Sequence, residues 1–121
     1  MMKKFLLLIT LLMMLPANAG VYEDALAKNN NVFLYLYTPE CSTCKAFEEI
    51  YSDIQKSNKD FGYVKVNAET SYGMRLMIKY RGRFVPYIVL TNSKTKKSVN
   101  VNHSCVMNEV CLLRAMKNFK G

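Results

Sequence analysis

The junction between an apolar run and an amphipathic segment constrains the fold of this chain most. Residues 32–37, VFLYLY, are continuously apolar and rich in β-branched and aromatic types, which is typical of a strand buried on both faces. A short turn, TPE, interrupts the run, and a helix is predicted over about residues 41–57. Its apolar stripe consists of Phe47, Ile50, Tyr51 and Ile54. The residues expected to face solvent are Glu48, Glu49 and Asp53.

The other segments continue the alternation of strands and helices. The predicted helices cover residues 21–28, 41–57, 71–80 and 108–119, and the predicted strands cover residues 32–37, 63–67, 87–91 and 98–102. Thr70 is a good N-cap for the third helix, and its residues Met74, Met77 and Ile78 are expected to face the core. A right-handed crossover makes the first two strands parallel, and the closing hairpin is antiparallel. The chain is therefore expected to be α/β, with a four-stranded mixed sheet flanked by helices on both faces.

Residues 1–19 have the pattern of a secretory signal peptide. A basic start, MMKK, precedes an apolar run over residues 5–15 and the small-residue segment PANA. This order predicts cleavage after Ala19 and a single domain over residues 20–121. The apolar run is shorter than the roughly 20 residues of a membrane-spanning helix, which favours cleavage over an uncleaved anchor. We therefore expect an exported protein with no stable membrane insertion after cleavage.

Charge and cysteine content further narrow the class of protein to which this chain can belong. The formal net charge is +8, but the basic residues form no dense block with interleaved aromatics, and export also argues against a nucleic-acid partner. All four cysteines lie after the predicted cleavage site. An even number of cysteines in an exported chain predicts disulfides.

Cys41 and Cys44 stand where the buried strand ends and the amphipathic helix begins. Backbone N–H groups and the dipole at a helix N-terminus favour a thiolate there. The two-residue spacing lets the second sulfur resolve a mixed disulfide formed by the first. We expect Cys41 to be exposed and nucleophilic, and Cys44 to be shielded and resolving.

The same spacing has two other interpretations. Cys41 and Cys44 could supply half of a zinc site that Cys105 and Cys111 complete, or they could form a purely structural disulfide. The strand–turn–helix context favours redox chemistry over both.

Three segments carry a resemblance to the thioredoxin family. VFLYLYTPECSTCKAF, residues 32–47, resembles the active-site strand, loop and helix of thioredoxins. VKVNAE, residues 64–69, is similar to the next strand of the family, and YRGRFVP, residues 80–86, to the segment that leads into its cis-proline. The resemblance covers essentially all of residues 21–121 and implies a thioredoxin-like fold without the extra N-terminal strand of larger members. The most similar branch is the periplasmic one that serves disulfide exchange.

The resemblance implies a function as a thiol–disulfide oxidoreductase of the periplasm that uses Cys41 and Cys44 and needs no cofactor. It implies that Val85–Pro86 forms a cis peptide against this pair, next to which substrate backbone binds in extended form. An ordinary trans proline at the start of a strand is the alternative. The implied partners are exported proteins with cysteine thiols or disulfides, and a membrane or periplasmic redox partner.

Several positions depart from the family pattern. Glu40 replaces the tryptophan that usually precedes the first cysteine, and Ser42-Thr43 replaces Gly-Pro. Tyr35 occupies the strand position where cytosolic members carry a buried acid for proton transfer, so Cys44 has no obvious side-chain base.

Two further residues are candidate modulators of the cysteine pair. Lys65 is expected near the pair by resemblance, although a strand lysine is often only solvated. His103, on the loop expected to flank the cysteines, could tune Cys41 or be an ordinary surface histidine.

Two other functions remain open from the sequence. A copper-delivery module could use Cys41, Cys44 and His103, with Met74 and Met77 as soft ligands, although copper domains of this kind usually have a wider cysteine spacing. A non-catalytic adaptor held by disulfides is the third possibility, and it predicts an inert Cys41.

Cys105 and Cys111 are predicted to form a second, structural disulfide. Within one helix their Cα atoms would be roughly 9 Å apart, whereas a disulfide needs about 4.4–6.8 Å. Asn108 is a good N-cap and Glu109 suits a first turn, so the chain is expected to bend there and fold Cys105 back over Cys111. The alternative is a relay in which this pair exchanges with Cys41 and Cys44.

Overall fold

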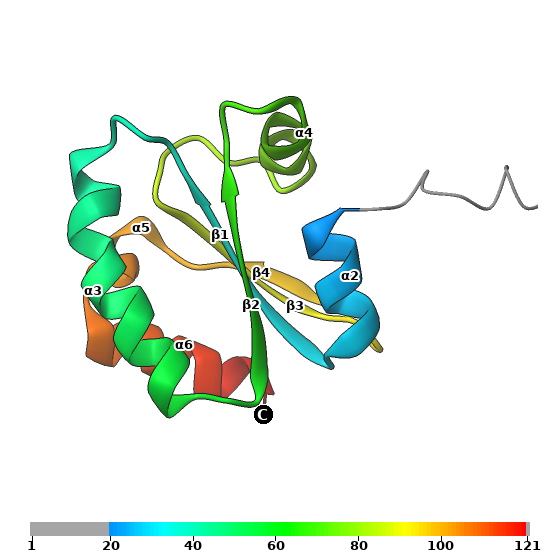
Figure 1. Ribbon diagram of the computed structural model, residues 1–121. Helices are drawn as coiled ribbons and strands as arrows, with labels where there is room; N and C mark the ends of the chain where they lie inside the picture. Colours follow the sequence, from blue (N-terminus) through cyan, green and yellow to red (C-terminus); the bar gives the residue numbers. More distant parts are fainter. Residues whose placement is uncertain (1–19, 121) are drawn as a thin grey trace, which may run out of the picture.

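The computed structural model describes residues 20–120 (Figure 1). The helices are α2 (Val21–Lys28), α3 (Ser42–Ser57), α4 (Ser71–Lys79), α5 (His103–Val106) and α6 (Glu109–Lys120), and the strands are β1 (Asn31–Tyr37), β2 (Phe61–Asn67), β3 (Tyr87–Asn92) and β4 (Ser98–Asn100). The predicted leader and its cleavage site lie outside the described residues. No helix within residues 20–120 has both the length and the apolar character needed to cross a membrane.

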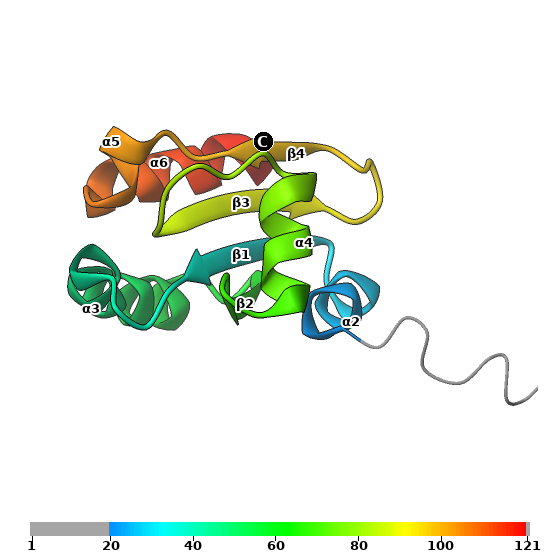
Figure 2. The same ribbon diagram turned by 90° about the horizontal axis from the view of Figure 1, so that it is seen from above.

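The four strands form one mixed sheet in the order β2-β1-β3-β4, and Figure 2 shows them side by side in this order. β1 runs parallel to β2, with Asn31 opposite Phe61, and antiparallel to β3, with Asn31 opposite Asn92. β3 and β4 are the antiparallel hairpin. The predicted mixed sheet is confirmed, and β1 is its central strand, with residues 32–36 fully buried.

Helices cover both faces of this sheet (Figure 1). Alternate residues of β1 point to opposite faces, which is the ordinary period of a strand. Phe33 and Tyr35 join the core under α3, α5 and α6, whereas Leu34 and Leu36 join the core under α2 and α4. The helical stripe predicted for α3 lies in the first core, where Phe47 is fully buried. Burial of a side chain of this size contributes about 1.5–3 kcal/mol.

The prediction for the buried face of α4 is wrong at two positions. Met74 is 53% exposed and Ile78 is 72% exposed. The helix begins after the predicted N-cap Thr70, but it turns Gly73 and Leu76 inward. Gly73 lies against the backbone of Asn67, where a Cβ atom would overlap the carbonyl oxygen. This close approach fixes the rotation of α4.

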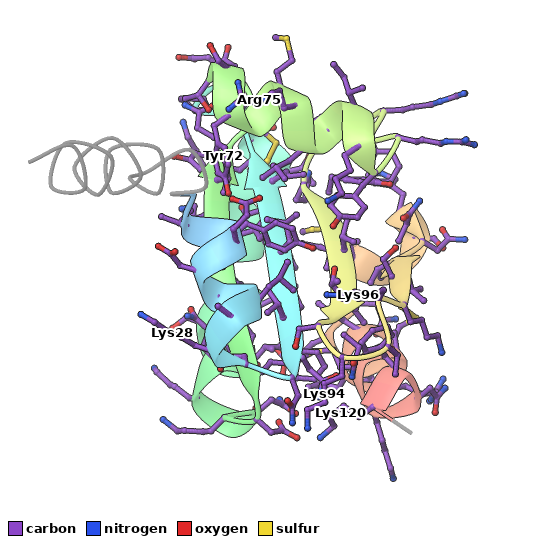
Figure 3. The ribbon with its side chains drawn as sticks, turned by 90° about the vertical axis from the view of Figure 1, so that its right-hand side faces the viewer. Lys28, Tyr72, Arg75, Lys94, Lys96 and Lys120 are labelled. Atoms are coloured by element: carbon purple, nitrogen blue, oxygen red, sulfur yellow. A yellow bond between two sulfur atoms is a disulfide. The ribbon has the colours of Figure 1, made fainter. Side chains whose placement is uncertain are left out.

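The side chain of Tyr72 joins α4 to the beginning of α2, and Figure 3 shows it between these helices. Its hydroxyl accepts a hydrogen bond from the Tyr22 backbone N–H at 3.0 Å and donates one to Glu23 at 2.5 Å. Burial and the bond to Glu23 raise the pKa of Tyr72 to about 12. The N-terminal helix is therefore held to the domain by polar as well as apolar contacts.

The end of the chain contains a helix that the sequence analysis did not predict. The four residues of α5, His103–Val106, precede a turn and the final helix α6. Asn102 caps α5, since its side chain accepts from the Ser104 N–H at 3.0 Å. The expected bend is present, and the Asn108 side chain accepts from the Cys111 N–H at 3.1 Å.

Candidate active site

Cys41 and Cys44 form a disulfide at the beginning of α3, with Cα atoms 5.1 Å apart. Cys41 is the N-cap residue, in an extended conformation at φ −80° and ψ 107°. Its Sγ atom accepts a hydrogen bond from the backbone N–H of Cys44 at 2.9 Å. The first sulfur therefore takes the place that a serine or aspartate oxygen has in an ordinary helix cap.

The two sulfurs differ in their access to solvent. Cys44 is only 3% exposed and lies within the first turn of α3, whereas Cys41 is half-buried. The disulfide thus presents Cys41 at the surface and covers Cys44 with the fold.

The Val85–Pro86 segment lies next to this disulfide. The Val85 carbonyl oxygen is 3.7 Å from the Cys41 Sγ atom. The Val85–Pro86 peptide bond is cis, and Pro86 is buried directly before β3. The fold therefore brings together the cysteines and the proline, which are more than forty residues apart in the chain.

Tyr35 lies beneath the second cysteine. Its side chain is fully buried, and its hydroxyl donates a hydrogen bond to the Cys44 carbonyl oxygen at 3.2 Å. Burial raises the pKa of Tyr35, and the negative charge of Glu48 acts in the same direction. At this strand position a neutral phenol therefore contacts the turn that carries Cys44.

Lys65 forms an ion pair with Glu48, a residue that the sequence analysis placed in solvent. Its Nζ atom also lies 4.5 Å from the centre of the Tyr37 ring and 5.7 Å from that of Tyr35. No single-sequence pattern predicts the Lys65–Glu48 pair, because it depends on how α3 crosses β2. The spacing of Glu48, four residues after Cys44, is the signal that could have singled it out.

The other candidate modulators lie at the surface. Glu40 is exposed in the turn before Cys41. His103 is exposed at the start of α5, and its ring centre is 4.4 Å from that of Phe84, a neighbour of Val85. Both rings line a cavity of about 340 Å³ together with Arg81 and Arg83. His103 therefore flanks the proline segment, on a side of the site with basic and aromatic groups.

Cys105 and Cys111 form the second disulfide, with Cα atoms 5.3 Å apart. Cys105 is 8% exposed and belongs to the core beneath α3, α5 and α6. The turn between the two cysteines is closed by a hydrogen bond from the Asn108 N–H to the Cys105 carbonyl at 3.0 Å. This disulfide joins α5 to α6.

Among residues 20–120, no group of three or more His, Cys, Asp and Glu side chains is arranged to hold a metal ion. The zinc and copper interpretations therefore gain no support from the geometry. Met74, one of the suggested soft ligands, is instead an exposed residue of α4, and Met77 packs partly buried against the core under α2 and α4.

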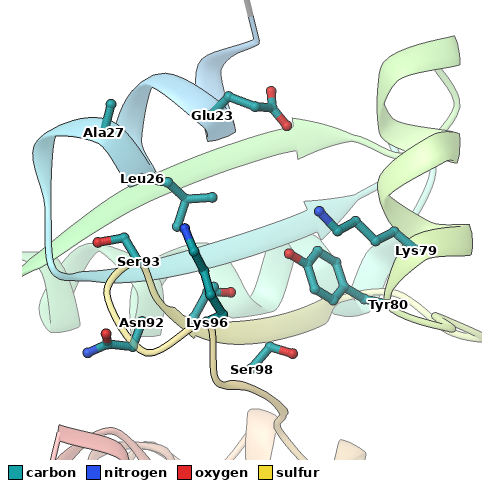
Figure 4. Close-up of a pocket in the computed structure, with 10 residues that line it drawn as sticks. Glu23, Leu26, Ala27, Lys79, Tyr80, Asn92, Ser93, Lys96 and Ser98 are labelled. Atoms are coloured by element: carbon teal, nitrogen blue, oxygen red, sulfur yellow. The ribbon is translucent and has the colours of Figure 1, made fainter. Parts of the chain in front are cut away.

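A cavity of about 670 Å³ is lined by none of the cysteines. Figure 4 shows Leu26, Tyr80 and Lys96 around it, from α2, the end of α4 and the β3–β4 turn. Beneath it, the Tyr22 hydroxyl is 2.6 Å from that of Tyr80 and 2.7 Å from that of Thr91. These buried hydroxyl groups therefore satisfy one another.

Comparison with known proteins identifies relatives of this arrangement. Residues 13–109 match the sequence profile of the family described as Thioredoxin. No curated protein sequence matches the chain. Among solved structures, thioredoxin F from spinach chloroplast is 19% identical, with a TM-score of 0.70, and the match covers 84% of this chain and 80% of that one.

Two prokaryotic proteins give similar results. A mutant thioredoxin from Halobacterium salinarum is 21% identical, with a TM-score of 0.69, covering 84% of this chain and 87% of that one. A thioredoxin from Thermus thermophilus is 21% identical, with a TM-score of 0.67, covering 81% of this chain and 82% of that one. At these identities the structural matches establish the fold.

Proposed function

This chain belongs to the thioredoxin family, and we propose that it is an exported thiol–disulfide oxidoreductase that acts through Cys41 and Cys44. The observation that carries the proposal is the asymmetry of the pair at the start of α3. Cys41 is half-buried, whereas Cys44 is 3% exposed. An attacking sulfur must be reachable by another protein, whereas a resolving sulfur only has to reach its partner.

The helix start supports a reactive Cys41. In the disulfide, its Sγ atom already accepts the Cys44 backbone N–H at 2.9 Å. After reduction, the same N–H and the dipole of α3 stabilise a negative charge on this sulfur. A stabilised thiolate at an accessible position is the species that attacks a disulfide.

The proposed exchange transfers two electrons in two steps. The Cys41 thiolate attacks a client disulfide, forms a mixed disulfide and releases one client thiolate. The Cys44 thiol then loses its proton and attacks the Cys41 sulfur, so that the Cys41–Cys44 bond forms and the second client thiolate leaves. The client is reduced and this protein is oxidised; a client dithiol drives the same steps in reverse.

The Val85–Pro86 segment is the proposed docking site for the client. The Val85 carbonyl oxygen lies 3.7 Å from the Cys41 sulfur, so a chain in extended form can bind this segment while its cysteine meets Cys41. The proposed partners are exported proteins with cysteine thiols or disulfides and a periplasmic or membrane redox protein that resets the pair.

Trapping tests the assignment of the two cysteines. Cys44→Ser should accumulate mixed disulfides between Cys41 and client proteins, visible on non-reducing gels and located by mass spectrometry. Cys41→Ser should accumulate none. Trapping by Cys41→Ser alone would reverse the two roles, and an inert Cys41 would favour the adaptor function.

Export is tested separately at the N-terminus. Expression with residues 1–19 in place should yield a periplasmic protein that begins at Gly20, as read by mass spectrometry. A protein that keeps residues 1–19 would be tethered to the membrane instead.

A further inference from the structure

Glu48 has a shielded oxygen with no partner in the described part of the chain. It lies on α3, and its Oε1 atom pairs with the Nζ atom of Lys65 on β2. Its Oε2 atom is shielded from solvent and has no hydrogen-bond partner among the described residues. The side chain as a whole is 41% exposed, so the shielded oxygen is the inward one. An unpartnered buried carboxylate oxygen is costly and calls for an explanation.

The groups facing this carboxylate come from each element around it. Tyr35 of β1 is fully buried, Tyr51 of α3 is 8% exposed, and Lys65 of β2 supplies a positive charge. Burial raises the pKa of Tyr35 and of Tyr51, and the charge of Glu48 adds to both effects. Both phenols therefore stay neutral at ordinary pH, and Lys65 is the positive charge paired with the carboxylate.

The same carboxylate lies one helical turn from the shielded cysteine. Residues four apart on a helix have Cβ atoms about 5–6 Å apart, and helix side chains lean toward the N-terminus. Glu48 therefore extends over the turn that holds Cys44. Tyr35 links the two positions, because its hydroxyl donates a hydrogen bond to the Cys44 carbonyl at 3.2 Å and the charge of Glu48 helps to raise its pKa.

We propose that Glu48 accepts the proton of the Cys44 thiol when Cys44 resolves a mixed disulfide. The inference rests on the proposed oxidoreductase function and adds a residue to it. The thiol proton moves to the Glu48 carboxylate, the Cys44–Cys41 bond forms, the bond from Cys41 to the client sulfur breaks, and the client leaves as a thiolate. In the reverse direction, the Glu48 carboxylic acid protonates Cys44 as it leaves.

The surroundings of Cys44 explain why an internal acceptor is needed. Its side chain is 3% exposed, so bases dissolved in water have little access to its proton. The neighbouring strand offers only the phenol of Tyr35, which is too weak a base to take that proton. Glu48 provides a carboxylate from α3 itself.

The test measures the lifetime of the mixed disulfide. Reduced protein is mixed with a disulfide-linked peptide and quenched with acid, and the Cys41–peptide adduct is followed by mass spectrometry from about pH 5 to about pH 9. Glu48→Gln should lengthen the adduct lifetime at least about tenfold near neutral pH, because the internal proton acceptor is lost. Glu49→Gln, which removes the same charge from the exposed neighbouring position, should leave the lifetime unchanged.

A second variant separates proton transfer from a structural effect. Lys65→Gln breaks the same ion pair but keeps the carboxylate, so its adduct should resolve faster than that of Glu48→Gln. An equal lifetime in Glu48→Gln and Glu49→Gln would overturn the inference. A shorter lifetime in Glu48→Gln would also overturn it, since Glu48 would then only disfavour the thiolate by its charge. Absence of any Cys41 adduct in the unaltered protein would instead refute the oxidoreductase function.

Discussion

Cys41–Cys44 and Cys105–Cys111 are both short-range disulfides, joining residues 3 and 6 positions apart with Cα atoms 5.1 and 5.3 Å apart. Their surroundings differ. The first caps α3, presents one half-buried sulfur and lies beside the Val85 carbonyl, whereas the second joins α5 to α6 and packs into a hydrophobic core. Connectivity alone therefore does not assign a role to a disulfide. Access to a sulfur, and a docking segment next to it, are what make exchange with another protein feasible.

The largest contrast concerns activity. Cys41→Ser should reduce the rate of disulfide exchange with a model peptide by at least about three orders of magnitude, because a hydroxyl cannot form the mixed disulfide. The Cys105→Ala/Cys111→Ala protein should keep its activity. Comparable losses in both would show that the two disulfides work as one system.

Graded reduction should separate the two disulfides next. Because Cys41 is accessible and Cys105 is in the core, Cys41–Cys44 should be half reduced at a ratio of reduced to oxidised reductant at least tenfold lower than Cys105–Cys111. This corresponds to a difference in reduction potential of at least about 30 mV. Differential alkylation and peptide mapping at each step give the state of each cysteine. Joint titration, or a captured link from Cys41 to Cys105, would favour the relay.

For stability we expect the second disulfide, Cys105–Cys111, to matter, although its loss leaves activity unchanged. Loss of the second disulfide in Cys105→Ala/Cys111→Ala should lower the free energy of unfolding by about 2 kcal/mol, the value expected for a loop of this length. Denaturant unfolding of the oxidised proteins measures this change. An unchanged midpoint would mean that α6 needs no covalent link to α5.

The smallest expected difference concerns alkaline pH. It should lower the stability of the protein equally with and without the Cys105–Cys111 disulfide. The pKa of Tyr72 rises from 10.0 to about 12 on folding. The stabilisation of the fold by this group is therefore fully present below pH 10 and is lost as the pH rises toward about 12. Stability measured against pH should fall over this window in the unaltered protein and in Cys105→Ala/Cys111→Ala alike. Tyr72→Phe should flatten the fall, and a curve that this substitution leaves unchanged would contradict the assignment.

Much of the fold was predictable because its patterns are local. The apolar run of β1, the stripe of α3 and the N-cap Thr70 each lie within one element, and the structure contains all three. The prediction failed for the inward face of α4, where Met74 and Ile78 are exposed. The rotation of that helix depends on the approach of Gly73 to Asn67, which a single-sequence pattern does not contain.

The candidate site likewise has residues that the sequence identifies and residues whose role depends on contacts between elements. Cys41, Cys44 and Pro86 were identifiable from spacing and resemblance. The helical spacing of Glu48 from Cys44 was available in the sequence, but its pairing was not, because that depends on Tyr35 and Lys65 from two neighbouring strands. Contacts between elements were thus the part that the sequence analysis could not supply.

The order of the strands has a consequence for how the chain reaches this fold. β1 lies near the beginning of the described chain, yet its partner β3 is far away in the sequence, with Asn31 opposite Asn92. Both disulfides close short loops, so loop entropy favours them over any link between Cys41 or Cys44 and the C-terminal pair, even in an unfolded chain. Neither one fixes the long-range register, so the sheet is complete only when β3 pairs with β1, a non-local contact of the kind that slows folding.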